Sequence, residues 1–449
     1  MKKWAKILSC GLLCAVALTG CATVGNLTNN NPELIYNGTS AVMVEGHLYY
    51  GNALVADVST LKTEDDYNSS AASSYLSRLN TTGRVENADN GSAKNVEKVD
   101  GEVVGGKQNF MFVLGQDIYY ATPNTQKGED AEGNTGNYYN YTSIYRTNLN
   151  GDRKTKLYTT SSEVSTIEAL KFENRYYIVM LSGERLLKID LQDGKAYELA
   201  TGVKSVAVPK TYQKDKVGST LDWNGQIYFT TSAEEGSSLH DALKRVNVAN
   251  GEVKTILYNG DSISFIGRER DVVFYTQSNE TFFADVNQNN FVGQLFYPSS
   301  SVTNISAVVS TGASTSTRLE GYVCMAGSNL AYVKTNGAHG TITLDGISSY
   351  SVLFVSGKLA YLATSGGIYE VDLSSIFNNG STTAAYKTIV TSANSKIQTS
   401  AYAYDREYIY FYAKLEEAGE EATDGEICYM FRARIDGTSE SAQLISQRV

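Results

Sequence analysis

Residues 171–200 read KFENRYYIVMLSGERLLKIDLQDGKAYELA, which is three short apolar runs separated by two turns. The apolar runs are Tyr176 to Leu181, Leu186 to Leu191 and Tyr197 to Ala200. One turn contains Gly183 and the other contains Asp193-Gly194. Because glycine reaches the positive φ angles that tight hairpin turns need, this stretch predicts a meander of antiparallel β-strands.

The same pattern recurs along the chain. Each copy has a strand with a polar, an apolar and then aromatic residues, followed by a second strand that ends close to an Asn/Asp–Gly turn. The first strands of the eight copies are His47–Tyr50, Asp117–Tyr120, Tyr176–Leu181, Gln226–Phe229, Asp271–Tyr275, Gly321–Cys324, Lys358–Tyr361 and Glu407–Phe411. Their spacing of about 50 residues is typical of a four-stranded propeller blade. We therefore predict an all-β protein, a β-propeller of eight four-stranded antiparallel blades. The sixth copy is degenerate, and its merger with the fifth would leave seven blades.

The composition agrees with this fold class. Tyr, Val, Thr and Gly are abundant, prolines number only four, and no long apolar stripe of period 3.6 occurs. This balance favours strands over helices. Continuous apolar runs such as Tyr176 to Leu181 indicate strands that are buried on both faces. Strands with one face in solvent alternate apolar and polar residues instead. Blades that stack into a closed ring bury their strands in this way.

The first 20 residues have the features of an export signal. Three lysines precede the apolar segment from Ile7 to Leu18, which is too short to span a bilayer as a mature helix. The segment ends in Leu18-Thr19-Gly20-Cys21, which resembles the lipobox of bacterial lipoproteins. The resemblance implies cleavage before Cys21 and a diacylglycerol on its thiol. We expect a lipoprotein signal peptide at 1–20, a flexible tether at 21–36 and the propeller at 37–449.

The charge balance limits the possible partners. Removal of residues 1–20 takes away three lysines and no acidic residue, which changes the net charge from −10 to −13. An acidic surface disfavours nucleic acid and anionic lipid. The lipid on Cys21 would therefore hold the protein at the membrane, on the extracytoplasmic side of the bacterial cell envelope.

The repeats also resemble a known group of proteins. The strands Ile118–Ala121, Ile227–Thr230 and Val273–Thr276, with Tyr145–Gly151 and Leu187–Gly194, are similar to bacterial propeller domains of the DUF5050 type. That group is related to TolB and to the YWTD repeats of low-density-lipoprotein receptors. The resemblance extends over residues 37–449 and implies a propeller fold. No copy carries the full YWTD tetrad, so the resemblance implies no ligand.

Surplus length is concentrated in the loops between the second and third strands. These insertions are residues 51–74, 121–141, 231–242 and 413–427, in copies one, two, four and eight. In a closed ring, blades eight, one and two are consecutive, so three insertions would crowd one sector of one face. Aromatic and amide groups suit a sugar or a peptide, and carboxylates suit a basic partner or a cation. The candidate binding residues are Tyr67, Tyr138, Tyr139, Asn140, Tyr141, Glu416 and Glu420. An ordinary tyrosine-rich strand end and a solvated acidic loop are the alternative interpretations.

The sequence contains no catalytic or metal-binding signature. The histidines are isolated, and no zinc, nucleotide-binding or nucleophile-elbow motif occurs. We expect no metal and no cofactor, and we expect Cys324 and Cys428 to be buried free thiols. The leading hypothesis is a non-catalytic binding or scaffold module for a protein or glycan partner. The alternative is a propeller hydrolase or lyase that acts on cell-surface polysaccharide, since carboxylate pairing depends on three-dimensional position.

Overall fold

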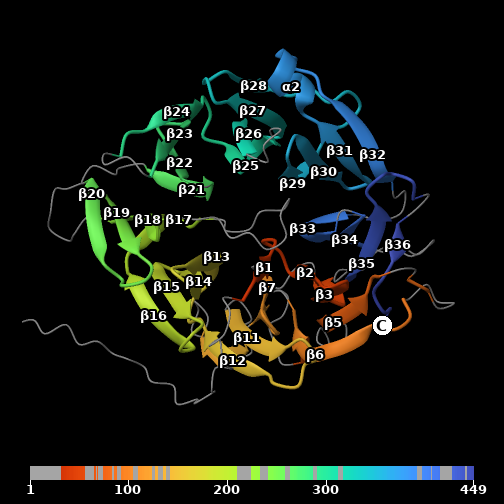
Figure 1. Ribbon diagram of the computed structural model, residues 1–449. Helices are drawn as coiled ribbons and strands as arrows, with labels where there is room; N and C mark the ends of the chain where they lie inside the picture. Colours follow the sequence, from red (N-terminus) through yellow and green to blue (C-terminus); the bar gives the residue numbers. More distant parts are fainter. Residues whose placement is uncertain are drawn as a thin grey trace, which may run out of the picture.

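The computed structural model describes residues 32–55, 65–66, 68, 74–82, 85–87, 93–104, 110–123, 127–129, 135–137, 142–209, 224–232, 241–257, 263–269, 271–286, 291–311, 317–391, 397–405, 407–414, 427–439 and 442–448. Within these ranges, eight antiparallel sheets stand around a central axis (Figure 1). The chain builds them one after another, once round the ring. No helix in the same ranges is both long and apolar enough to cross a bilayer.

The first four blades use the first half of the chain. Blade 1 contains β2 (Ala41–Val44), β3 (His47–Gly51), β5 (Tyr75–Asn80) and β6 (Glu97–Val103). Blade 2 contains β7 (Met111–Leu114), β8 (Asp117–Pro123), β11 (Thr142–Asn148) and β12 (Thr155–Thr159). Blade 3 contains β13 (Val164–Phe172), β14 (Arg175–Ser182), β15 (Arg185–Asp190) and β16 (Lys195–Ala200). Blade 4 contains β17 (Val203–Ala207), β18 (Gln226–Thr231), β19 (Ala242–Asn247) and β20 (Val253–Leu257).

The second half builds the remaining four. Blade 5 contains β21 (Ser264–Glu269), β22 (Val272–Gln277), β23 (Glu280–Asp285) and β24 (Gln294–Tyr297). Blade 6 contains β25 (Val302–Thr311), β26 (Thr317–Ala326), β27 (Asn329–Lys334) and β28 (His339–Thr341). Blade 7 contains β29 (Ser351–Ser356), β30 (Leu359–Thr364), β31 (Gly367–Asp372) and β32 (Ala385–Thr391), with the short helix α2 (Ser374–Asn379) before β32. Blade 8 contains β33 (Ile397–Tyr404), β34 (Tyr408–Lys414), β35 (Ile427–Arg434) and β36 (Gln443–Leu444).

The eight-bladed prediction is confirmed. The fifth and sixth copies form two separate sheets, β21–β24 and β25–β28, so the seven-bladed alternative is wrong. The strand pairs predicted from 171–200 are also present: Tyr177 lies opposite Asp190 in β14 and β15. Gly183 and Gly194 in the two turns have φ angles of 57° and 69°, as tight hairpins require.

The core lies between neighbouring blades. One cluster joins blades 2 and 3 through residues such as Phe112, Tyr119 and Ile178. Another joins blades 7 and 8, where the rings of Phe354 and Tyr402 stack with their centroids 5.4 Å apart. Each sheet therefore contributes both faces to the core, which explains why the central strands are apolar without alternation.

The last residues of the expected tether, 21–36, form a strand. β1 (Leu34–Tyr36) adds a fifth strand to the inner edge of blade 2, with Leu34 opposite Leu114 and Tyr36 opposite Phe112. The ring of Tyr36 packs edge-to-face on Phe110, with the centroids 5.6 Å apart. Three residues are too few to show a period, so no pattern of apolar residues predicts this strand.

Candidate functional site

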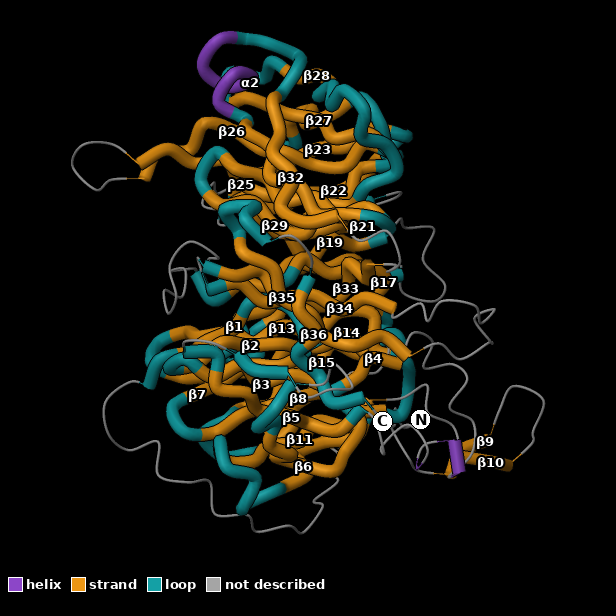
Figure 2. Tube along the Cα trace, turned by 90° about the vertical axis from the view of Figure 1, so that its right-hand side faces the viewer, coloured by secondary structure: helices purple, strands orange, loops and turns teal. Residues whose placement is uncertain are grey.

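The strand order assigns every loop to one of two faces. Neighbouring strands in each blade are antiparallel, so the loops between second and third strands lie on the same face as the connections between blades. We call this side the insertion face and the opposite side the turn face. Figure 2 shows the ring from the side, with the hairpin of β9 (Lys127–Glu129) and β10 (Thr135–Asn137) projecting at the right, on the insertion face.

The predicted site residues lie outside the described residues. This holds for Cys21, Tyr67, Tyr138, Tyr139, Asn140, Tyr141, Glu416 and Glu420. Their roles therefore stay predictions. The structure does describe the strands from which the insertions leave, and it places these strands on blades 8, 1 and 2, which are consecutive in the ring.

The insertions of blades 1 and 8 leave from two strands that pair with each other. β4 (Ala53–Val55) comes directly before residues 56–64, and β35 begins directly after residues 415–426. The two strands are antiparallel, with Leu54 opposite Cys428. β4 therefore completes the outer edge of β35, where β36 supplies only two residue pairs. Blade 1 thus donates a strand to blade 8 and joins the two insertions at their stems.

Asn52, directly before β4, is fully buried and holds the end of the chain. Its Nδ2 donates to the backbone oxygen of Gln447 at 2.9 Å, and its Oδ1 accepts from the backbone nitrogen of Gln447 at 2.8 Å. The Ser446 hydroxyl donates to the Asn52 backbone oxygen at 2.5 Å, and the Tyr75 hydroxyl donates to Oε1 of Gln447 at 2.9 Å. We call Asn52, Tyr75, Ser446 and Gln447 the closure clasp.

Two buried tyrosines reinforce the same junction. The Tyr412 hydroxyl donates to the backbone oxygen of Gly51 at 2.5 Å, and the Tyr50 hydroxyl donates to the backbone oxygen of Ile445 at 2.9 Å. Burial raises the pKa of both phenols well above the ordinary value. Both hydroxyls therefore stay protonated and keep donating at physiological pH, which fixes the base of the two insertions.

The third insertion leaves from blade 2. Its stem is closed by Thr142 and Pro123, which lie opposite each other in β11 and β8. Within the insertion, β9 pairs with β10, and Lys127 lies opposite Asn137. Asn137 directly precedes the predicted run of Tyr138, Tyr139, Asn140 and Tyr141, so the hairpin stands next to that run in the chain.

A crevice opens between the innermost strands of blades 5 and 6. Its volume is about 330 Å³, and residues 266–269, Phe274 and residues 302–305 line it. Both strands carry a β-bulge here, and Asn304 has a positive φ angle of 53°. A Cβ built on Gly267 meets no atom within 4 Å, so the space above this residue is open. The volume is at the lower end of the range typical of small-molecule sites.

Asp100 and Glu102 place two carboxylates together at the outer edge of blade 1. The Lys154 ammonium lies 3.2 Å from Oδ1 of Asp100 and 2.8 Å from Oε1 of Glu102. The Tyr120 hydroxyl donates to Oδ2 of Asp100 at 2.9 Å. Burial, and after it the charge of Asp100, raises the pKa of Tyr120. These carboxylates are engaged in an ion cluster on β6, far out from the axis of the ring.

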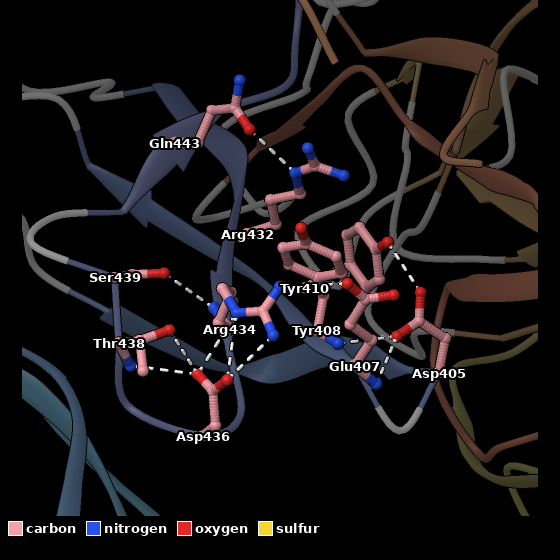
Figure 3. Close-up of polar contacts among 10 residues, drawn as sticks. All are labelled: Asp405, Glu407, Tyr408, Tyr410, Arg432, Arg434, Asp436, Thr438, Ser439 and Gln443. Atoms are coloured by element: carbon pink, nitrogen blue, oxygen red, sulfur yellow. Dashed lines mark hydrogen bonds and ion pairs between the residues drawn. The ribbon is translucent and has the colours of Figure 1, made fainter. Parts of the chain in front are cut away.

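A polar cluster on the turn face locks the two turns of blade 8 together (Figure 3). The guanidinium carbons of Arg432 and Arg434 lie 4.2 and 5.7 Å from the centre of the Tyr408 ring. Arg434 also pairs with Asp436 at 2.8 Å, and this bond lowers the pKa of the Asp436 carboxyl. Asp405 accepts the backbone N–H of Tyr408 at 2.7 Å. These bonds join members of the cluster to one another, so we assign the cluster a structural role.

The described ranges contain no group of three or more His, Cys, Asp or Glu side chains that is arranged to hold a metal ion. Cys324 and Cys428 are both buried free thiols, as the sequence predicts. Burial raises the pKa of Cys324 to about 12 and that of Cys428 to about 11. Both thiols are therefore protonated and unreactive at neutral pH.

No family model matches this chain, and no curated protein matches it. Its assignment to the DUF5050 type therefore stays a prediction. Among solved structures, it is similar to dipeptidyl peptidase 4 from Porphyromonas gingivalis (TM-score 0.44, 12% identity, 92% of this chain and 60% of that chain). It is also similar to apo AztD from Citrobacter koseri (TM-score 0.41, 8% identity, 80% and 95%) and to TolB from Acinetobacter baumannii (TM-score 0.29, 12% identity, 68% and 61%). At these identities the similarity concerns the fold alone.

Proposed function

We propose that this protein is a non-catalytic binding or scaffold module that holds a protein or glycan partner on its insertion face. The observation that carries the proposal is the pairing of β4 with β35. Because the insertion of blade 1 follows β4 and that of blade 8 precedes β35, the two insertions leave the ring from paired strands. Loops that a rigid scaffold positions are the usual place for binding. The closure clasp supplies that rigidity directly beneath the two insertions.

The predicted residues indicate which chemical groups the partner would carry. Tyr138, Tyr139, Asn140 and Tyr141 on blade 2 would stack on apolar ring faces and hydrogen-bond to hydroxyl or amide groups. Tyr67 would add a further aromatic surface from blade 1. On blade 8, Glu416 and Glu420 would face basic groups of the partner. Sugars and extended peptides both offer this combination of flat apolar surfaces and hydrogen-bonding groups.

The lipid anchor on Cys21 is part of the same proposal. The basic start, the short apolar segment and the Leu18-Thr19-Gly20-Cys21 tetrad support it, and they would place the propeller outside the cytoplasm on the bacterial cell envelope. With a net charge of −13 after removal of residues 1–20, attraction to anionic lipid would not hold the protein there.

Loop replacement on the two faces tests the binding proposal. In one variant, residues 57–73 of blade 1 are replaced by a short Gly-Ser linker. In the matched control, residues 210–222, between the first and second strands of blade 4 and therefore on the turn face, are replaced in the same way. Binding is measured on a glycan array and with detergent-solubilised cell envelope. We expect wild type and control to bind the same partner and the 57–73 variant to lose it. Equal binding by all three would contradict the proposal.

The alternative is a hydrolase or lyase that acts on cell-surface polysaccharide. It requires two carboxylates that reach the scissile bond. Asp100 and Glu102, on the outermost strand of blade 1, are instead bridged by Lys154, and this supports the binding module. Release of new reducing ends from polysaccharide by the wild-type protein would reverse this choice.

A further inference from the structure

We propose that the propeller stands on the membrane with its turn face toward the bilayer and its insertion face away from it. The proposal rests on the lipid anchor at Cys21 and adds the orientation that this anchor imposes. The observation that carries it is the place where the N-terminal segment joins the ring, at β1 on the inner edge of blade 2.

The direction of β1 determines the face at which the chain enters. β7, the first strand of blade 2, runs from the insertion face to the turn at Gly115 on the turn face. β1 is antiparallel to β7, and Leu34 lies opposite Leu114, directly beside that turn. Tyr36 lies opposite Phe112, further toward the insertion face. The chain therefore enters the ring at the turn face and runs along β1 toward the insertion face.

The entry point is held by contacts with two blades. The backbone N–H of Gly115 in blade 2 donates to the backbone oxygen of Glu33 at 3.4 Å. The Tyr176 hydroxyl, at the turn-face end of β14 in blade 3, donates to the backbone oxygen of Pro32. Leu34 and Tyr36 are buried in the core between these blades. Pro32 is therefore fixed on the turn face, near the axis of the ring.

The length of the segment before Pro32 restricts where the lipid can lie. Pro32 is eleven residue-to-residue steps from Cys21, and fully extended these steps span at most about 36–40 Å. A path round the rim to the insertion face would cross the four strand spacings from β1 to β12, about 19 Å, and then the height of a strand of eight residues, about 26 Å. That path is longer than the reach of the segment, so a lipid on Cys21 could not enter the bilayer by that route. On the turn face, the same segment has its full length available.

This orientation has a consequence for the binding site. The stems at β4, β35 and the β8–β11 connection all lie on the insertion face, and the lipid would hold that face about 26 Å further from the bilayer than the turn face. A partner would therefore reach the insertions from the side away from the membrane, without competing with lipid for the same surface.

Two labels on one blade test the orientation. Glu184, in the turn between β14 and β15, is exposed on the insertion face, and Gln192, after β15, is exposed on the turn face. Glu184→Cys and Gln192→Cys are labelled separately with a fluorescent donor, in full-length lipidated protein. Cys324 and Cys428 do not compete for the label, because both are buried thiols whose pKa is raised to about 12 and about 11. The protein is reconstituted in vesicles of phosphatidylethanolamine and phosphatidylglycerol that carry a headgroup acceptor.

We expect about twofold higher energy transfer from Gln192→Cys than from Glu184→Cys, because eight residues of strand, about 26 Å, separate the two positions. Flotation of the vesicles measures the anchor independently, with Cys21→Ser as the variant that should no longer float. If wild type does not float, the anchor is wrong and the orientation falls with it. If wild type floats but transfer from Glu184→Cys is equal or higher, the anchor stands and the orientation is overturned, because the chain then turns back through or around the ring.

Discussion

Asn52 and Gln447 lie 395 residues apart in the chain and exchange two hydrogen bonds, of 2.9 and 2.8 Å. The side-chain amide of Asn52 faces the backbone N–H and C=O of Gln447 in the way that a residue of a neighbouring strand would. Asn52 thereby extends the contact that β4 makes with β35. Closure of the ring therefore combines a three-residue strand with a set of hydrogen bonds from buried side chains, rather than a complete exchanged strand.

Asn52→Ala should weaken the junction between blades 8 and 1. The substitution removes these partners from the backbone N–H and C=O of the half-buried Gln447, and a group left unpaired in the interior costs about 1–3 kcal/mol. We expect a loss of about 2–4 kcal/mol in the free energy of unfolding, measured by urea denaturation. Gln447→Ala is the comparison variant: it keeps both backbone groups that Asn52 binds but loses the bond that Oε1 accepts from Tyr75, so it should cost less than Asn52→Ala. A loss from Gln447→Ala as large as that from Asn52→Ala would contradict the role we assign to the amide of Asn52.

Substitutions at two glycines in equivalent turns distinguish the cost of backbone strain from the cost of disturbed packing between blades. Gly151 of blade 2 and Gly251 of blade 4 have φ angles of 86° and 73°, so alanine at either position costs about 1–2 kcal/mol of strain. A Cβ on Gly151 would also overlap the backbone oxygen of Val99 in blade 1, whereas a Cβ on Gly251 meets nothing within 4 Å. Gly151→Ala should therefore cost at least about 1–3 kcal/mol more than Gly251→Ala in thermal or urea unfolding. Equal losses would show that the turn of blade 2 moves away from blade 1 without penalty.

Alkaline pH should unfold the propeller cooperatively. Burial raises the pKa of Tyr119 and Tyr176 to about 12, from an ordinary 10.0, and that of Cys324 to about 12, from 9.0. These groups bind their protons more tightly in the folded state, so their stabilising contribution is complete below pH 9 and is lost as the pH rises through 12. We expect tyrosinate absorbance and the loss of β-sheet circular dichroism to rise together in this range. Ionisation of most tyrosines near pH 10 with the sheets intact would show that the phenols are accessible.

The sequence predicted the parts of the fold that repeat locally. The blade spacing, the β14–β15 hairpin and the buried state of Cys324 follow from patterns within one unit. No sequence pattern predicts β1 or β4, because each has only three residues. No pattern predicts the closure clasp either, because it consists of individual hydrogen bonds. Asn52 looks like any loop asparagine until the ring brings Gln447 next to it. For the same reason, the sequence predicted which blades carry insertions but not that β4 and β35 would join two of them.

Lys188 offers a last test of how neighbouring blades are held together. This lysine of β15 in blade 3 is buried, and its Nζ donates to the backbone oxygens of Val248 and Ala249 in blade 4, at 2.6 and 2.9 Å. Burial lowers the pKa of its ammonium group, so desolvation offsets part of what these bonds contribute. Lys188→Met keeps most of the side-chain volume but leaves both oxygens without this donor. We expect a loss of about 1–3 kcal/mol in urea unfolding.

Lys195→Met, in the exposed start of β16, is the matched control for Lys188→Met and should change the free energy of unfolding by less than about 0.5 kcal/mol. Amide hydrogen exchange gives a second measure. In Lys188→Met, the amides of the β19–β20 turn in blade 4 should exchange faster, because the lysine that holds this turn from blade 3 is gone. Unchanged exchange in that turn, together with unchanged stability, would mean that apolar packing between blades 3 and 4 holds the turn in place without the lysine.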